Sequence, residues 1–212
     1  MTRSEISTRL IAGRLIAVIR AKRFDQALPL CRALVEGGIT NLEITLSTPD
    51  ALKAIRLVAS ELGNTALVGV GTVLDAATAT AAIEAGAEFV VSPICRPEIA
   101  QAAHALGKPV MLGAYTPTEA QLAHEAGADF VKLFPADGLG LGYIKSLRAP
   151  LPHLRLVPTG GVTLDNVADF FAVGCPAVGV GSSLITAQIL ETDDWAALKE
   201  LAAKFVAQLK AG

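Results

Sequence analysis

Two stretches of this sequence, EAGAEFVVSP (84–93) and EAGADFVKLF (125–134), are close copies that lie 41 residues apart. Looser copies are EGGITNLEIT (36–45) and AVGCPAVGVG (172–181). In each copy a helix with apolar periodicity is stopped by a glycine and followed by a short buried strand. A helix-then-strand unit that recurs along one chain predicts parallel strands joined by right-handed crossovers.

Extending this pattern along the chain gives eight strands. They are predicted at 14–20, 42–46, 66–71, 89–93, 109–113, 130–134, 154–159 and 177–181. Helices are expected near 25–36, 50–61, 76–85, 97–106, 117–126, 140–148, 163–173 and 193–209. Eight alternating units in 212 residues favour an α/β fold, a (β/α)8 TIM barrel with a short N-terminal helix, formed as one domain by residues 1–212. An open doubly wound sheet is the alternative.

Composition excludes several classes of function. The hydrophobic fraction of 52% and the charged fraction of 18% predict an extensive core, and a net charge of −2 offers no basic surface for nucleic acid or membranes. Cys31, Cys95 and Cys175 suggest neither a disulfide framework nor a zinc site, which fits a cytoplasmic protein. Residues 1–15 lack the apolar core of a signal peptide. The uncharged stretch 170–190 is interrupted by glycine, proline and serine, which argues against a membrane span.

A single lysine lies inside a predicted strand. In FVKLF (130–134), period-two alternation places Lys132 with the two phenylalanines on one face and the two aliphatic residues on the other. The aliphatic face should meet the helices, so Lys132 is expected to point into the barrel. The alternative is a structural ion pair or a frayed strand end. Lysine is almost never fully buried without a partner or a purpose.

One glutamate has a matching position. In LEITL (42–46), Leu42 and Ile44 should face outward, so Glu43 and Thr45 should face the barrel interior. One lysine and one glutamate are therefore expected in the same barrel from different strands. A plain buried salt bridge is the alternative, although buried pairs are poor stabilisers.

A lysine and a carboxylate in an apolar site can perform Schiff-base chemistry. The uncharged amine attacks a carbonyl, and the resulting iminium draws electrons from an adjacent carbon–carbon bond. Val131, Leu133 and Phe134 provide apolar surroundings that favour the uncharged amine. The glutamate can move protons in several of the steps. HExxH, clustered carboxylates and a nucleophile elbow are all missing, so neither a metal nor a cofactor is expected.

Two glycine-rich loops predict a phosphate site. VPTGGVTLDN (157–166) and GVGSSL (179–184) include the ends of the seventh and eighth strands, where barrels of this class commonly hold phosphate. Glycines let backbone N–H groups approach the oxygens, and serines add hydroxyl donors. The candidate phosphate-binding residues are Gly160, Gly161, Ser182 and Ser183.

Several motifs together resemble one family. They are LEIT (42–45), GVGTVL (69–74), VSP (91–93), GAYTPTE (113–119), FVKLFPA (130–136) and PTGGV (158–162). Nearly the whole chain resembles the bacterial 2-keto-3-deoxy-6-phosphogluconate aldolases, many of which also cleave 4-hydroxy-2-oxoglutarate. The resemblance implies a metal-free, cofactor-free lyase that takes a phosphosugar acid, gives pyruvate and glyceraldehyde 3-phosphate, and forms a homotrimer. It also implies a place in Entner–Doudoroff carbohydrate metabolism.

The resemblance also implies a role for each matching residue. Lys132 would form the Schiff base and Glu43 would act as the acid and base. The substrate-binding residues would include Thr72 and Pro93 at the pyruvate end, Thr159 at the substrate hydroxyls, and Phe134. Gly160, Gly161 and Ser182 would bind the phosphate.

One position departs from the family pattern. Many members carry an arginine two residues after LEVT, which helps to hold the pyruvyl carboxylate, whereas this chain has Ser47. Arg20, at the end of the first strand, is placed to take over. The related 6-phosphogalactonate aldolases share this variant pattern, but they tend to lack the threonine that is kept here as Thr159. The gluconate substrate is therefore favoured over the galactonate epimer. A phosphosugar isomerase, epimerase or binding barrel is the further alternative.

Overall fold

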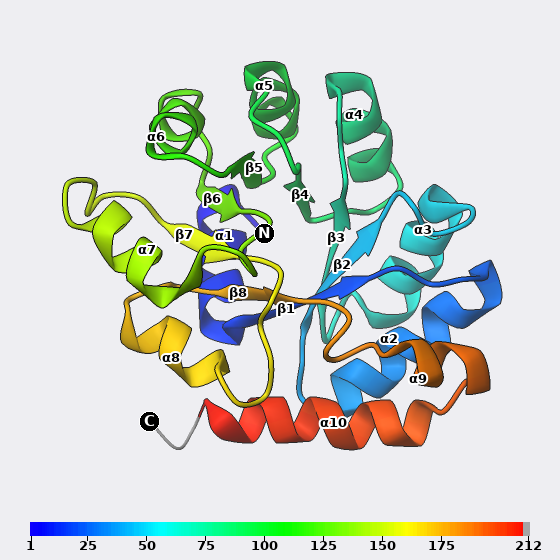
Figure 1. Ribbon diagram of the computed structural model, residues 1–212. Coiled ribbons are helices and arrows are strands. Elements are labelled where there is room, and N and C mark those ends of the chain that lie inside the picture. The colour runs from blue at the N-terminus through cyan, green and yellow to red at the C-terminus, as the bar shows by residue number, and fades with distance from the viewer. Residues whose placement is uncertain (210–212) are drawn as a thin grey trace.

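The computed structural model describes residues 1–209. Eight strands alternate with helices, and the helices surround the strands (Figure 1). The strands are β1 (Leu15–Ile19), β2 (Asn41–Thr45), β3 (Leu67–Gly71), β4 (Phe89–Val91), β5 (Val110–Ala114), β6 (Phe130–Leu133), β7 (Leu156–Pro158) and β8 (Val178–Val180). The helices are α1 (Arg3–Gly13), α2 (Ala27–Glu36), α3 (Ala51–Leu62), α4 (Ala76–Glu84), α5 (Pro97–Ala105), α6 (Pro117–Glu125), α7 (Gly140–Arg148), α8 (Val167–Ala172), α9 (Ala187–Thr192) and α10 (Trp195–Gln208), with a 3₁₀ turn, η1, at Phe24–Gln26.

The strands form one parallel sheet that closes on itself. Their order is β7-β6-β5-β4-β3-β2-β1-β8, and every pair is parallel. A parallel bridge between Thr159, directly after β7, and Gly179 in β8 joins the two ends. The prediction of a (β/α)8 barrel with a short N-terminal helix is therefore confirmed, and the open doubly wound sheet is wrong.

The repeated unit has the same stop signal in all four copies. Gly38, Gly86, Gly127 and Gly174 each follow a helix and have φ values of 95°, 112°, 89° and 85°. Only glycine adopts this left-handed region without a steric cost, so each helix ends there and the chain turns back into the sheet.

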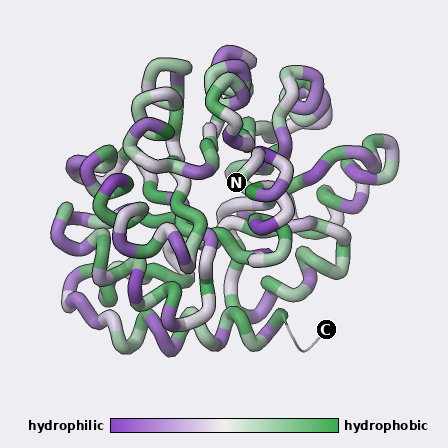
Figure 2. Tube along the Cα trace, turned by 180° about the vertical axis from the view of Figure 1, so that it is seen from behind, coloured by the Kyte–Doolittle hydropathy of each residue, from purple (hydrophilic) through white to green (hydrophobic). Residues whose placement is uncertain are grey.

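Alternation along the strands creates two separate apolar regions. Phe89 and Phe130 belong to a cluster inside the barrel, whereas Val131 and Leu133 belong to the larger cluster between strands and helices. The tube coloured by hydropathy shows hydrophobic segments on the central strands and alternating colours along the outer helices (Figure 2). The prediction for β6 is therefore confirmed: residue 130 faces the barrel interior, and residues 131 and 133 face the helices.

Helix α1 closes the N-terminal end of the barrel and is seen within the ring of outer helices (Figure 1). Thr2 caps it, because the Thr2 hydroxyl accepts from the Glu5 N–H while the Glu5 carboxylate accepts from the Thr2 N–H. Ile6 and Leu10, exposed by 0% and 1%, pack into the inner cluster. The floor of the barrel is therefore apolar and closed, and the open end is the C-terminal one.

The structure corrects several predicted boundaries. The strands predicted at 89–93, 154–159 and 177–181 are shorter, because their outer residues leave the sheet to form loops. Helix α8 is shorter than the helix predicted near 163–173, and helix α9 was not predicted, since six residues show only a weak period. The last three residues of the expected domain, 210–212, lie outside the described residues. Among the helices of the described part, none is long and apolar enough to cross a membrane.

Candidate active site

Lys132 and Glu43 meet inside the barrel from opposite sides. Lys132 lies in β6 and Glu43 in β2, and Nζ of the lysine is 3.4 Å from Oε1 of the glutamate. The two side chains are only 6% and 3% exposed. An isolated buried charge is costly, so these two groups depend on each other. The pairing predicted from inward positions on two strands is confirmed as a contact.

The surroundings of the lysine suit an amine that reacts with a carbonyl. Nζ lies 5.3 Å from the centre of the Phe134 ring, and the fully buried Phe89 and the nearly buried Phe130 belong to the cluster inside the barrel. A carboxylate within reach of the amine can accept and return a proton. The arrangement therefore provides a nucleophile and a proton carrier in a water-poor site.

Most of the predicted binding residues gather around one cavity of about 290 Å³ at the mouth of the barrel. Its lining includes Arg20, Phe134, Thr159, Gly160, Gly161, Ser182 and Ser183. Arg20 directly follows β1, the two glycines follow β7, and the serines follow β8. Three adjacent strand ends thus form one polar pocket, as the barrel prediction requires.

The Gly-Gly loop is held in a turn that requires glycine. Gly160 and Gly161 have φ values of 97° and 69°. Asn166 fixes the loop, because its side chain donates to the Gly161 carbonyl at 2.9 Å and accepts from the Thr163 N–H at 2.8 Å. The backbone around the two glycines is therefore held for an incoming ligand.

The two serines have different environments. Oγ of Ser183 donates to the Val162 carbonyl at 2.5 Å, so this hydroxyl joins the loop after β7 to the loop after β8. Ser182 is exposed at the cavity. Of the two, Ser182 has the hydroxyl that is better placed to donate to a bound anion.

A short hydrogen-bond chain links Ser47 to the end of β1. Oγ1 of Thr45 donates to the Ile19 carbonyl at 2.9 Å and lies 2.8 Å from Oγ of Ser47. Because the hydrogen of Thr45 is used by Ile19, Ser47 must be the donor in the second contact. Ile19 directly precedes Arg20. The sequence placed Thr45 in the interior but gave it no role, and its inward position was the only signal.

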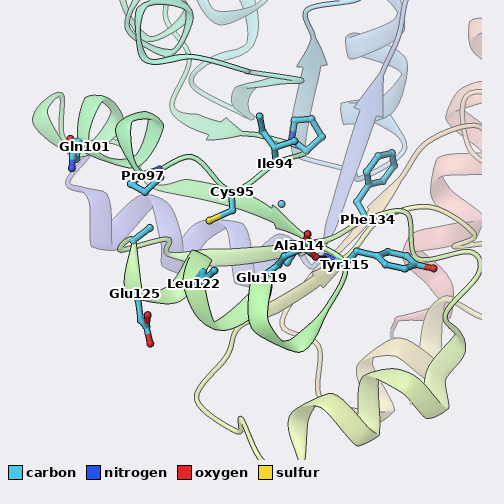
Figure 3. A pocket seen from close by; sticks show the side chains of 13 residues that line it. Ile94, Cys95, Pro97, Gln101, Ala114, Tyr115, Glu119, Leu122, Glu125 and Phe134 are labelled. Atoms are coloured by element: carbon cyan, nitrogen blue, oxygen red, sulfur yellow. Dashed lines mark hydrogen bonds between the residues drawn. The ribbon is translucent and has the colours of Figure 1, made fainter.

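Thr72 and Pro93 lie outside this cavity. Thr72 directly follows β3 and has a φ of 64°, which is rare for a β-branched residue and is typical of strained positions in sites. Pro93 lines a second, larger cavity of about 820 Å³ together with Phe134. Figure 3 shows this cavity, with Cys95, Leu122 and Glu119 around it. Its lining includes residues of α5 and α6.

The cysteines are poor candidates for nucleophilic chemistry. Burial raises the pKa of Cys31, and it raises the pKa of Cys175 to about 12. Burial also raises the pKa of Cys95, and the charge of Glu119 adds to this effect. Thiolates are therefore scarce at neutral pH.

Histidine and acidic residues have structural contacts elsewhere. Asp129 lies between Arg3, at 2.8 Å, and His104, at 3.1 Å, at the closed end of the barrel. Within residues 1–209, no group of three or more His, Cys, Asp or Glu side chains could hold a metal ion.

Comparison with known proteins agrees with this geometry. Residues 6–201 match the aldolase family model described as KDPG and KHG aldolase. A 2-dehydro-3-deoxy-phosphogluconate aldolase of Pseudomonas aeruginosa is 38% identical over 93% of this chain and 90% of its own length. A probable 2-dehydro-3-deoxy-6-phosphogalactonate aldolase of Rhizobium meliloti is 39% identical over 80% of this chain and 81% of its own length.

One similar solved structure contains a reaction intermediate. The KDPG aldolase of Legionella pneumophila, with pyruvate captured at low pH as a covalent carbinolamine, superposes with a TM-score of 0.86. It is 30% identical, and the match covers 93% of this chain and 96% of the other. Covalent chemistry with pyruvate thus occurs on a closely similar barrel.

Proposed function

Since this chain belongs to the KDPG and KHG aldolase family, we propose that it is a class I aldolase that cleaves 2-keto-3-deoxy-6-phosphogluconate to pyruvate and glyceraldehyde 3-phosphate. We expect it to cleave 4-hydroxy-2-oxoglutarate as well. The observation that carries the proposal is the buried contact between Lys132 and Glu43, at 3.4 Å across the barrel.

The proposed reaction begins at the lysine. The Lys132 amine adds to the C2 carbonyl of the substrate, and loss of water gives an iminium. Glu43 takes the proton of the C4 hydroxyl, the C3–C4 bond breaks, and its electrons move toward the iminium to form an enamine. The aldehyde leaves, C3 of the enamine gains a proton, and water hydrolyses the iminium to release pyruvate and the free lysine.

The remaining residues are assigned by their place at the barrel mouth. We propose that Arg20 binds the pyruvyl carboxylate, Thr159 contacts the substrate hydroxyls, and Gly160, Gly161 and Ser182 bind the phosphate. The assignment of Arg20 is supported by its place in the cavity lining. Ser47, at the end of the neighbouring strand, has no charge with which to bind a carboxylate.

For the other predicted substrate-binding residues, we propose the roles that the family resemblance implies. Thr72 and Pro93 would border the pyruvate end, and Phe134 would contact substrate beside the lysine. Ser183 would complete the phosphate site through its backbone N–H, because its hydroxyl is used by Val162.

Trapping the covalent intermediate tests this function. Incubation with pyruvate and borohydride should add one reduced pyruvyl group to Lys132, located by peptide mass spectrometry. Lys132→Met should remain unmodified and inactive. Modification of another lysine would reject Lys132 as the Schiff-base residue. The absence of any modification in the wild type would reject the mechanism and favour an isomerase, an epimerase or a binding barrel.

The galactonate epimer is a second candidate substrate. It is favoured by the Arg20–Ser47 pattern and by the 39% identity with the Rhizobium meliloti protein. Thr159 favours the gluconate substrate. Initial rates of pyruvate release from the two epimeric phosphosugar acids decide between them.

We further infer a cytoplasmic homotrimer that serves Entner–Doudoroff metabolism. The exposed apolar residues Ile94, Tyr115 and Leu122 beside the larger cavity support contact with another copy of the chain. Light scattering should give three times the mass of the 21.9 kDa chain, and a monomeric mass would exclude the trimer.

A further inference from the structure

Three strand glycines lie directly against proposed site residues of neighbouring segments. They are Gly71 in β3, Gly113 in β5 and Gly179 in β8. A methyl group on each would come closer than 3.0 Å to Glu43, Pro93 and Thr159, respectively. Real Cβ atoms essentially never approach other atoms so closely. The missing side chain therefore provides the space that the neighbouring residue occupies.

The backbone does not explain these glycines. None of the three has a φ in the left-handed region, so alanine could adopt the same backbone conformation. Gly160 and Gly161 differ, because their positive φ values require glycine whatever the surrounding space. The requirement at Gly71, Gly113 and Gly179 is thus one of space.

Gly71 has the most direct relation to the proposed chemistry. A methyl group there would overlap Oε1, Cδ and Cγ of Glu43, and Oε1 is the atom that lies 3.4 Å from Nζ of Lys132. The Glu43 side chain is only 3% exposed, so it has little room to move aside. The position of the carboxylate therefore depends on the absence of a side chain at residue 71.

We propose that Gly71 is a positioning residue that keeps the Glu43 carboxylate beside Lys132. We propose likewise that Gly179 leaves the space that holds the Thr159 side chain in its observed position. The catalytic consequence rests on the proposed aldolase function, whereas the packing relation does not. Gly113 has the same lack of space, but a methyl group there would meet backbone atoms of Pro93 and Ile94. Backbone atoms cannot move aside as a flexible side chain can.

The expected effect of Gly71→Ala follows from proton-transfer geometry. Displacing a catalytic group by about 1 Å can lower a rate on the order of 10²-fold. We expect kcat to fall by this factor, with a smaller change in KM, because substrate contacts at the barrel mouth are retained. Borohydride should still trap pyruvate on Lys132, but more slowly.

A double-mutant cycle with Glu43→Ala separates positioning from a general structural role. Glu43→Ala removes all three atoms that the new methyl group would overlap. Gly71→Ala should therefore lower the unfolding midpoint and kcat in the wild type, but neither value further in Glu43→Ala. Equal losses in both backgrounds would overturn the proposal. If Gly71→Ala alone does not fold, folding of the double variant supports it and failure of both variants rejects it.

Gly142→Ala is the matched control. Gly142 lies in α7, where an added methyl group meets nothing within 4 Å, so stability and kcat should not fall. The unfolding midpoints in the double-mutant cycle can be compared whether or not the protein is an aldolase. Coupling in stability without trapping on Lys132 in the wild type would reject the aldolase function but keep the packing relation.

The second pair allows the same cycle with another readout. Gly179→Ala would overlap Oγ1 and Cγ2 of Thr159 and should alter the ratio of rates with the two epimeric phosphosugar acids. In a Thr159→Ala background the ratio should not change further. A change of equal size in both backgrounds would exclude positioning through Thr159.

Discussion

Arg20 and Ser47 lie at the ends of neighbouring strands, where the chain departs from the usual family pattern. Arg20 lines the small cavity, and its preceding residue, Ile19, accepts a hydrogen bond from Thr45. Thr45 in turn contacts Ser47. The end of β1, which precedes Arg20, is thus held by hydrogen bonds from the segment that has Ser47 in place of the usual arginine. This arrangement supports a carboxylate-binding role for Arg20.

Replacing Arg20 tests this role with two substrates. One carries a phosphate, 2-keto-3-deoxy-6-phosphogluconate, and the other, 4-hydroxy-2-oxoglutarate, does not. Arg20→Ala should raise KM for both by roughly 10- to 100-fold, because a hydrogen-bonded charge contact is lost. An increase confined to the phosphorylated substrate would assign Arg20 to the phosphate, and unchanged KM values would make it structural.

At the scale of the element, hydrogen bonds at the start of helix α6 fix the loop beside the larger cavity. Helix α6 begins after Thr116, whose hydroxyl accepts from the Glu119 N–H at 3.3 Å. The Glu119 carboxylate accepts from the N–H groups of Tyr115 and Thr116 at 2.9 and 2.8 Å. These backbone donors lower the pKa of Glu119 below its usual value. The cap holds Tyr115 at the edge of the larger cavity.

Glu119→Ala should lower the stability of the chain in a pH-dependent way. A carboxylate with a lowered folded-state pKa stabilises the fold above its unfolded pKa, and this contribution is lost as the pH falls through the folded value. The difference in unfolding midpoint between wild type and variant should therefore be full at pH 7 and shrink below about pH 4.5. Because Glu119 is exposed, the difference should be small, at most a few degrees. A difference that does not change with pH would exclude the charged cap.

At the scale of the whole molecule, stability and chemistry occupy opposite ends of the barrel. Helix α1 closes the N-terminal end with Ile6 and Leu10, whereas the proposed site opens at the C-terminal strand ends. Figure 1 shows α1 within the ring of outer helices. Changes at the closed end should therefore alter stability more than catalysis.

Leu10→Ala tests this separation. Leu10 is 1% exposed and packs into the inner cluster, so the truncation should lower the free energy of unfolding by about 2–5 kcal/mol. Denaturant unfolding measures this loss, and kcat of the folded variant should remain unchanged. Wild-type stability would mean that α1 does not fill the barrel floor, and a large loss of kcat would show that the two ends are coupled.

Much of the fold followed from local signals in the sequence. The glycine stops at 38, 86, 127 and 174 have the positive φ that the repeat predicts, and the alternation in β6 places Lys132 inward. Strand ends and α9 were missed, because loops have no period and a six-residue helix shows only a weak one. The gathering of most predicted binding residues around one cavity followed from barrel geometry, but the places of Thr72 and Pro93 outside it did not. The hydrogen-bond partners of the cavity residues, such as Val162 for Ser183, did not follow from it either.

The sequence by itself determined the repeat, the eight strands, and the inward faces that carry one lysine and one glutamate. These features follow from the spacing of apolar residues and from the glycines at turns, and both are visible in short stretches of the sequence. Only the tertiary structure decided that Lys132 and Glu43 lie 3.4 Å apart across the barrel, and that Gly71 leaves the space for their contact. Such distances depend on how the barrel closes and how its side chains share one interior, and no local pattern records either.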